Sequence, residues 1–393
     1  TAYVSDGATH RILQLSSPAV AVGSDTIAPL ITPPSNISVD QNIASGINAT
    51  DPALTAFFAG ATATDNVGVA AAITHNAPLV LSAGVTTVTF AVVDNAGNAG
   101  YAVADITVNN IAPTGWTSTQ AAFVLPEDLA YGTPGYVIAN SLGSLYHSPD
   151  KTTWTEVVVG TGAGLLGVTW NGTQYVAVGG SGAVKTSIDG INWTTQNSGL
   201  GIFDVLNDIH WTGAQYIAVG SAGTTQTAFL ATSPDAVTWT IRPTPAVGAL
   251  WAVTSSSPTL IVAVGNAGII TSTDGVTWTK QTVPTTAQLY AVSYANGQFV
   301  AGGNGGKMLS SPDAITWTVR AGTTNRAIRD IAWNGFVFGA VGDVSSYQIS
   351  YDGIKWTLLP GNPSTLAPQF PSIIVVNSQF ITIDTNGAVY TQK

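Results

Sequence analysis

Short apolar runs alternate with turn-forming residues along most of this chain, and the alternation recurs at a regular period. In one repeat the runs occupy residues 167–170, 174–178, 183–186 and 192–196. The connectors between them include Asn171 with Gly172 and Asp189 with Gly190, dipeptides that favour tight hairpin turns. Each repeat therefore predicts four short antiparallel strands. Apolar residues rarely recur at the spacing of a helix, which predicts an all-β chain.

A tryptophan near the end of each repeat marks the period. These residues are Trp154, Trp193, Trp239, Trp278, Trp317 and Trp356, which lie 39 residues apart except for one gap of 46. Trp116 lies 38 residues before Trp154, and residues 373–392 add three more apolar runs. Four antiparallel strands in ~40 residues are typical of a β-propeller blade. We therefore predict a seven-bladed β-propeller over residues 113–393, whose last blade is completed by the strand around Trp116.

A motif of Ser, any residue, Asp, three variable residues, Trp and Thr accompanies each of the six later tryptophans. It resembles the Asp box of sialidase-like propellers, also called the bacterial neuraminidase repeat (BNR). Its acidic residues are Asp150, Asp189, Asp235, Asp274, Asp313 and Asp352. An aspartate in a hairpin turn can accept hydrogen bonds from the backbone of that turn. Six copies, one per blade, cannot share one active site, so we interpret these aspartates as structural.

Residues 25–112 have a different pattern. The phrases "DTIAP" from Asp25 and "DNAGN" from Asp94 resemble a hyalin-repeat or bacterial Ig-like module, which implies a β-sandwich that serves as a spacer or adhesive unit. Residues 1–24 match neither module, and we expect an N-terminal arm or linker that contacts other chains of an assembly. Because the chain begins at Thr1 without a methionine, we expect it to be processed or part of a longer protein.

The amino-acid composition excludes some kinds of binding partner and chemistry. The chain is 45% hydrophobic but only 8% charged, where roughly 25% is usual. Its net charge of −10 argues against a nucleic-acid partner, because an acidic surface repels phosphates. The absence of cysteine excludes disulfides and thiolate chemistry. No apolar run approaches ~18 residues, so membrane insertion is not expected.

Alignment of the repeats on their first strands defines a candidate binding face opposite the Asp boxes. One position holds Glu127, Leu166, Asn207, Trp251, Tyr290, Arg329 and Pro371, and the next holds Asp128, Gly167, Asp208, Ala252, Ala291, Asp330 and Ser372. Variation over a regular scaffold is where binding residues are usually found. The candidate ligand-binding residues on this face are Phe203, Asp208, Trp251, Tyr290, Arg326, Arg329 and Asp330, with Phe370 nearby in the same loops. The alternative is that the aromatic residues pack between blades.

The residues required of a sialidase are incomplete. That family needs three clustered arginines and a Phe/Tyr-Arg-Ile-Pro phrase, whereas this chain has five arginines in all and lacks the phrase. A different glycoside hydrolase would need a pair of carboxylates, for which Glu127, Asp128, Asp208 and Asp330 are available. No spacing singles out such a pair, so we assign no catalytic residue. The three aspartates of this set also allow a bound cation.

Two aspartates of the front module, Asp65 and Asp94, are candidates for a calcium site together with carbonyl oxygens. The simpler interpretation is that each caps its own turn. The four histidines show no spacing typical of zinc ligands.

Three functional hypotheses follow. The first is a non-enzymatic protein of a virion (phage) tail or an extracellular adhesin, in which the propeller performs host recognition by binding carbohydrate on a surface glycan receptor. The second is a secreted glycoside hydrolase on the same scaffold. The third is a structural propeller that binds only other proteins of its assembly.

Overall fold

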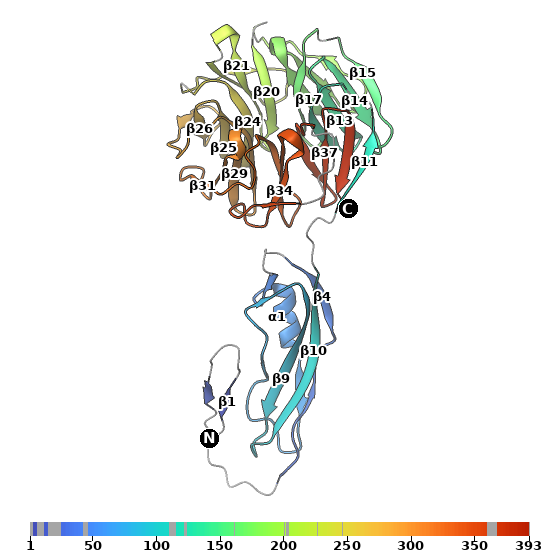
Figure 1. Cartoon of the computed structure of the whole chain (residues 1–393), viewed down its shortest axis with the longest axis vertical. Coiled ribbons are helices and arrows are strands. Elements are labelled where there is room, and N and C mark those ends of the chain that lie inside the picture. The colour runs from blue at the N-terminus through green and yellow to red at the C-terminus, as the bar shows by residue number, and fades with distance from the viewer. Residues whose placement is uncertain are drawn as a thin grey trace. The chain divides into compact units, whose positions relative to one another are not determined.

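The computed structural model describes residues 3–5, 12–14, 25–41, 46–109, 115–121, 124–160, 162–199, 201, 204–225, 227–245, 247–359 and 368–392. The chain divides into two compact units, Thr1–Ala112 and Pro113–Lys393. Within residues 1–24, where we predicted an arm, strands β1 (Tyr3–Ser5) and β2 (Ile12–Gln14) form a hairpin, and the rest lies outside the described residues. Both units are drawn in Figure 1, and strands dominate each of them.

The first unit is built around two long paired strands, β9 (Gly84–Val93) and β10 (Ala99–Asn109). A four-stranded sheet has the order β4 (Ile37–Asp40), β10, β9 and β7 (Thr74–His75), and β4 runs parallel to β10. Two smaller pairs join β3 (Leu30–Thr32) to β6 (Thr62–Thr64) and β5 (Ile47–Asn48) to β8 (Val80–Leu81). Buried and exposed residues alternate along β9 and β10, as expected for strands with one face on the core.

A helix that we did not predict, α1 (Pro52–Ala59), contributes to this core. Its N-terminus carries recognisable signals, because Asp51 accepts a hydrogen bond from the backbone N–H of Ala53 at 2.9 Å and Pro52 occupies the first turn. Leu54 and Phe57 face the core, where Phe57 packs on Phe90. With eight residues the helix is too short to show a clear helical period. No helix among the described residues is long and apolar enough to cross a membrane.

The described part of the second unit forms seven four-stranded antiparallel sheets. The first three comprise β12 (Pro126–Gly132), β13 (Gly135–Asn140), β14 (Ser144–Ser148) and β15 (Thr155–Val158); β16 (Leu165–Trp170), β17 (Tyr175–Gly179), β18 (Val184–Ser187) and β19 (Thr194–Thr195); and β20 (Val205–Trp211), β21 (Tyr216–Ala222), β22 (Thr227–Ser233) and β23 (Thr240–Ile241).

The next three sheets repeat this order along the chain. They comprise β24 (Leu250–Ser257), β25 (Leu260–Gly265), β26 (Gly268–Ser272) and β27 (Thr279–Lys280); β28 (Leu289–Ala295), β29 (Gln298–Gly303), β30 (Met308–Ser311) and β31 (Thr318–Arg320); and β32 (Ile328–Trp333), β33 (Phe338–Gly342), β34 (Tyr347–Ser350) and β35 (Thr357–Leu358). Within each sheet, neighbours in sequence are neighbours in space, which hairpin connections require.

The last sheet joins the two ends of the unit. Strands β36 (Ile373–Val376), β37 (Gln379–Ile383) and β38 (Ala388–Gln392) come from the end of the chain, and β11 (Trp116–Gln120) pairs with β38 as the fourth strand. Figure 1 shows the cyan strand β11 beside the red strands of the chain's end. The first strands of all seven sheets contact one another in cyclic order, from β12 round to β36 and back to β12. The second unit is therefore a closed ring of sheets.

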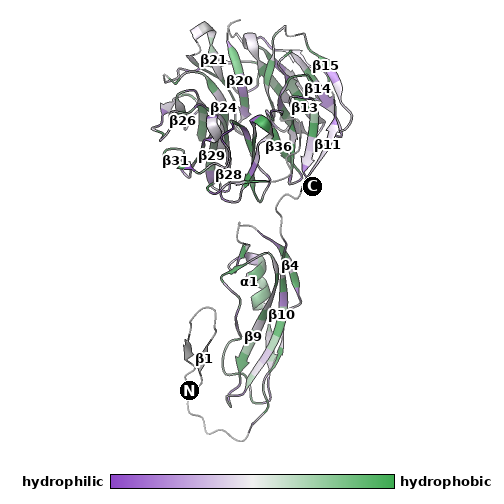
Figure 2. Cartoon of the chain, in the orientation of Figure 1, coloured by the Kyte–Doolittle hydropathy of each residue, from purple (hydrophilic) through white to green (hydrophobic). Residues whose placement is uncertain are grey.

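The core of this ring lies between neighbouring sheets rather than within one sheet. Second strands such as β13 and β17 are buried at every position, because both of their faces are covered. One apolar cluster joins Val176 and Val178 of β17 to Leu206 and Ile209 of β20, and similar clusters follow round the ring. Hydrophobic residues accordingly follow the inner strands in Figure 2.

Each Asp-box aspartate lies in the hairpin between the third and fourth strands of its sheet and hydrogen-bonds its own turn. Oδ1 of Asp189, for example, accepts from the backbone N–H of Ile191 at 2.9 Å and of Asn192 at 2.8 Å. The ring nitrogen of Trp193 donates to the carbonyl of Gly190 at 2.9 Å. Equivalent bonds recur at the other five aspartates. These bonds give every box aspartate a structural partner.

The residue after each box aspartate has a left-handed backbone, with φ between 61° and 74°. Glycine adopts this conformation without strain, and three of the six copies have it. Lys151, Ala236 and Ala314 occupy the same position in the other copies. The turn therefore keeps its shape even where the residue is not glycine, because the aspartate bonds hold it.

We expect Trp116→Ala to weaken closure of the ring. Trp116 is half-buried in the last sheet and packs edge-on against Tyr347 of the preceding sheet, with ring centroids 4.9 Å apart. Loss of a half-buried tryptophan should lower the free energy of unfolding by about 2 kcal/mol, measured by urea denaturation. Ser118→Ala, an exposed position on the same strand, is the control and should change it by less than about 0.5 kcal/mol. Equal stability of the two variants would contradict this role.

Candidate functional site

A β-bulge near the start of the first strand creates the candidate site in six of the seven sheets. In the first sheet, Pro126 pairs with Asn140 and Asp128 pairs with Ala139, so Glu127 is left without a partner residue. The same register shift leaves out Leu166, Asn207, Trp251, Tyr290 and Arg329 in the following sheets. A bulge bends the strand locally and re-aims the extra side chain. Six successive sheets therefore present one variable residue at equivalent places.

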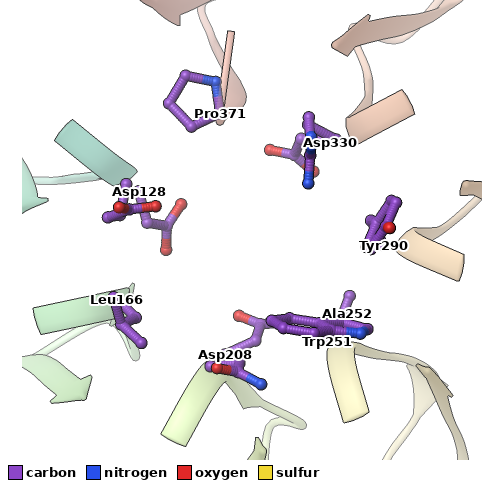
Figure 3. Close-up of a pocket in the computed structure, with 11 residues that line it drawn as sticks. Asp128, Leu166, Asp208, Trp251, Ala252, Tyr290, Asp330 and Pro371 are labelled. Carbon is purple, nitrogen blue, oxygen red and sulfur yellow. The ribbon is translucent and has the colours of Figure 1, made fainter. Parts of the chain in front are cut away.

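These residues line a single pocket at the centre of the ring. Its lining consists of Glu127, Asp128, Leu166, Asn207, Asp208, Trp251, Ala252, Tyr290, Arg329, Asp330 and Pro371, and its volume is about 100 Å³. Figure 3 shows the labelled side chains arranged round the opening, with Trp251 and Ala252 coming from the same strand. The structure thus brings together Asp208, Trp251, Tyr290, Arg329 and Asp330 from our candidate set.

Two other candidates, Arg326 and Phe370, do not join this pocket, and a third cannot be placed. Arg326 is exposed and is not among the lining residues. Phe370 is fully buried and packs edge-on against Tyr390, with ring centroids 5.4 Å apart, so it belongs to the core between sheets. Phe203 lies outside the described residues. The position of an aromatic residue in the sequence does not show whether its side chain is exposed in a loop or buried between sheets.

The three aspartates in the pocket tie neighbouring sheets together. Oδ1 of Asp128 accepts from the N–H of Leu129, the next residue, while Oδ2 accepts from the N–H of Val168 in the adjacent sheet at 2.8 Å. Asp208 reaches Val253 and Asp330 reaches Ile373 in the same way, each at 2.8 Å. Both oxygens of each of these two residues accept from backbone N–H groups, which gives Asp208 and Asp330 a structural role.

Burial opposes the charge on these aspartates. It raises the pKa of Asp208 from 3.8 to about 6 and that of Asp330 to about 7, although backbone hydrogen bonds to both carboxylates act in the opposite direction. The pKa of Asp128 is also raised well above its usual value, first by burial and then by repulsion from Asp208. The centre of the ring therefore holds carboxylates that share one small space and disfavour full ionisation.

The aromatic and basic residues of the pocket are held by neighbours that sequence reasoning missed. The guanidinium of Arg329 lies 4.7 Å from the centre of the Tyr290 ring and forms two hydrogen bonds with Asp343, at 2.8 and 3.1 Å. The ring nitrogen of Trp251 donates to Oδ1 of Asn266 at 2.6 Å. Asp343 and Asn266 directly follow the second strands of their sheets. Their pairing partners could not be read from the sequence.

This arrangement limits the chemistry available. A general acid or base needs a carboxylate that can reach a substrate, and the three aspartates are already bonded to the scaffold. Glu127 is half-buried, and burial raises its pKa while Ser141 and Arg329 lower it. A cavity of about 100 Å³ is smaller than the ~300 Å³ or more of typical small-molecule sites. The exposed faces of Trp251 and Tyr290 are better placed to contact a ligand that lies across the opening.

The central aspartates predict a distinctive pH dependence. A carboxylate whose pKa is raised on folding contributes stability below its unfolded pKa near 4 and loses that contribution as the pH rises through the folded value. The wild type should therefore become more stable relative to Asp330→Asn as the pH falls from 8 to 5. The quantity to measure is the free energy of unfolding of the wild type minus that of the variant. We expect a change of roughly 1 to 2 kcal/mol, based on about 1.4 kcal/mol per pKa unit and reduced for partial exposure.

The matched control is Asp313→Asn, because hydrogen bonds from the backbone of Thr316 and Ile315 lower the pKa of this box aspartate to about 2. Its difference from the wild type should stay constant over the same pH range. His210, whose pKa is lowered to about 4 by burial, is present in every protein compared and cancels in the differences. A flat profile for Asp330→Asn would show that Asp330 is ionised throughout.

Comparisons with known proteins support the fold of each unit. The HYR domain family matches residues 30–108. No curated protein matches the chain. Among solved structures, YCF48 bound to D1 peptide is 16% identical with a TM-score of 0.59, covering 72% of this chain and 96% of that one.

Two further structures match the same region. Virginiamycin B lyase from Staphylococcus aureus is 11% identical with a TM-score of 0.62, covering 71% of this chain and 98% of that one. The WD40 β-propeller domain of Doa1 is 12% identical with a TM-score of 0.52, covering 71% and 97%. At these identities the likeness concerns the fold alone. The chain is all-β, with a propeller fold in its second unit and a match to the HYR domain in its first.

Proposed function

We propose that this chain is a non-catalytic recognition protein of a virion tail or cell surface. In this proposal its second unit is a seven-bladed propeller of the Asp-box type, and an Ig-like HYR module before it serves as the spacer. The mouth of the propeller binds a carbohydrate on a surface glycan. The match to an HYR domain and the closed ring of sheets support this layout.

The observation that carries the proposal is an aromatic pair at the mouth of the pocket. Trp251 is 37% exposed, and its ring meets that of Tyr290 edge-on with centroids 5.9 Å apart. Large exposed aromatic rings are uncommon on a surface without a partner, and flat rings with polar neighbours suit the apolar faces and hydroxyls of a sugar. Bonds to Asn266 and Gln288 fix the polar edges of both rings before any ligand arrives. Such pre-organisation reduces the entropic cost of binding.

The hydrolase alternative is weaker on this geometry. Glycosidases need one carboxylic acid and one carboxylate placed on either side of the bond that breaks. Here Asp128, Asp208 and Asp330 each use both oxygens for backbone N–H groups. Glu127 remains, without a committed partner carboxylate. We therefore propose that the mouth binds its ligand without turnover.

A protein-binding scaffold is the second candidate, and one observation favours it. The Asp-box turns of five successive sheets expose an aliphatic side chain at the same position, between 37% and 60% accessible: Ile191, Val237, Val276, Ile315 and Ile354. A repeated apolar ring of this kind suits another protein of an assembly. The structural neighbour YCF48 was solved with a bound peptide, which illustrates such use of the fold by another protein.

Substitution of the aromatic pair separates these functions. Trp251→Ala should weaken binding on a glycan array, or to polysaccharide released from bacterial surfaces, by at least tenfold, which corresponds to about 1.4 kcal/mol. Ile315→Ala removes an apolar side chain on an Asp-box turn and should leave glycan binding unchanged. If Trp251→Ala left glycan binding unchanged and only Ile315→Ala lost the proteins captured in a pull-down, the result would favour the protein-binding scaffold. Release of reducing sugar by the wild type that is abolished in Asp208→Asn would contradict a non-catalytic role.

A further inference from the structure

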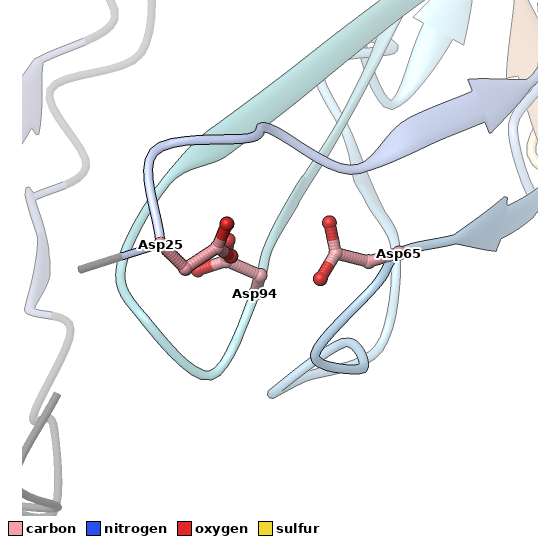
Figure 4. Close-up of side chains that lie close together, drawn as sticks. All are labelled: Asp25, Asp65 and Asp94. Atoms are coloured by element: carbon pink, nitrogen blue, oxygen red, sulfur yellow. The ribbon is translucent and has the colours of Figure 1, made fainter. Parts of the chain in front are cut away.

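Three carboxylates of the first unit converge from segments that are distant in the sequence. Asp25 precedes β3, Asp65 follows β6, and Asp94 lies at the turn between β9 and β10. One ligand atom from each residue can be chosen so that all three atoms lie within 4.8 Å of one another. Figure 4 shows the three side chains directed toward a common space. Our sequence analysis named Asp65 and Asp94, and the fold adds Asp25.

Each carboxylate uses an oxygen to hold its own segment, yet two of the remaining oxygens have no partner. Oδ1 of Asp25 accepts from the N–H of Ile27 at 3.1 Å, and Oδ2 of Asp65 accepts from the N–H of Val67 at 2.8 Å. The other oxygens, Oδ2 of Asp25 and Oδ1 of Asp65, are wholly buried without any hydrogen-bond partner. A buried carboxylate oxygen without a donor is costly, so such atoms mark a place where a further group belongs.

Asp94 is the most deeply buried member, at 2% exposure. Its Oδ1 accepts from the backbone N–H groups of Ala96 and Asn98, and its Oδ2 accepts from the side-chain amide of Asn98 at 2.7 Å. These bonds fix the orientation of the Asp94 carboxylate beside the other two side chains.

The described residues of the first unit include no lysine or arginine that could neutralise this cluster. Residues 12–150 contain neither lysine nor arginine, whereas residues 25–112 carry six aspartates. His75 stacks on Phe58 with ring centroids 4.0 Å apart, and burial lowers its pKa. Two neutral amides donate around the cluster: that of Asn66 to Oδ1 of Asp25 at 3.1 Å, and that of Asn98 to the carbonyls of Asp25 and Ile27. Among the described residues of this unit, no lysine or arginine opposes the repulsion among the three carboxylates.

From these observations we propose that Asp25, Asp65 and Asp94 bind one Ca²⁺ ion in the first unit. Calcium accepts six to eight oxygen ligands at about 2.3–2.6 Å, so ligand atoms on opposite sides of the ion lie about 5 Å apart, which fits the observed spacing. The two unpartnered oxygens and one from Asp94 supply three ligands, and water or backbone carbonyls complete the shell. The hard oxygen set, without histidine or cysteine, disfavours zinc and other softer metals.

Calcium at this place would reinforce the hydrogen bonds that already join three parts of the unit. It would hold the segment that begins at Asp25 against the turn after β9 and the loop after β6. Because the unfolded chain cannot assemble these ligands, calcium binding adds directly to the stability of the folded unit. The inference concerns the first unit alone and does not depend on the ligand proposed for the propeller mouth.

The test uses the full chain, freed of metal by EGTA and titrated with CaCl₂ by isothermal calorimetry. We expect one Ca²⁺ per chain, with a Kd on the order of 10⁻⁴ to 10⁻³ M as in extracellular modules. Asp65→Asn should weaken binding at least tenfold, because it removes a charge while the amide oxygen can still cap Val67. Asp105→Asn, which removes a charge from the same unit where the carboxylate bonds only Thr87, should bind calcium like the wild type.

Thermal unfolding provides a second measurement, which begins with the wild type and is then repeated on the two variants. Excess calcium should raise an unfolding transition by several degrees and EGTA should reverse the shift, with Asp65→Asn unresponsive and Asp105→Asn responsive. Circular dichroism in EGTA would establish that Asp65→Asn folds. The proposal would be overturned if the wild type showed no heat of binding and no thermal shift at about 10 mM Ca²⁺, because even the weakest extracellular sites would then be filled. Equal calcium affinity in Asp65→Asn and the wild type would also overturn it.

Discussion

The second unit depends on the closure of a ring, because no four-stranded sheet of this kind can bury both of its faces alone. Strands such as β13 and β17 are apolar on both sides and need a sheet against each face. A linear stack would leave two such faces in water, whereas a ring leaves none. The pairing of β11 with β38 joins residues 116–120 to residues 388–392 and gives the last sheet its fourth strand. Every interface round the ring relies on that pairing.

The candidate site is a product of the same constraint. The first strands crowd together at the centre, and Gly167 shows how closely they approach, since a Cβ there would lie 3.0 Å from Cα of Asp208. Bulges let each strand bend and turn one side chain into the central space. The residues after the bulge, Asp128, Asp208 and Asp330, then bond the next sheet. The residue at the bulge therefore lines the central pocket, whereas the residue after it bonds the adjacent sheet in three of the sheets.

The first unit is stabilised differently, because a small unit of short strands has little core. Its long pair β9 and β10 packs against α1 and a few apolar residues from the shorter strands. The ends of its strands are held by aspartate turns, and three of these turns place their carboxylates side by side. No lysine or arginine lies among the described residues of this unit to balance them.

Local patterns in the sequence determined the all-β character, the four-strand repeat, the place of the Asp-box turns and the aligned positions that meet at the mouth. Each depends on strand alternation, turn residues or a repeat period, which neighbouring residues encode. Only the tertiary structure decided which groups those positions face. In the folded protein, Oδ2 of Asp208 and of Asp330 accepts a hydrogen bond from the backbone of the adjacent sheet, and Arg329 pairs with Asp343. Phe370 is buried, and Asp25 lies close to Asp65 and Asp94. These contacts join residues far apart in the chain, and their energies depend on burial and distance, which exist only after the sheets have packed.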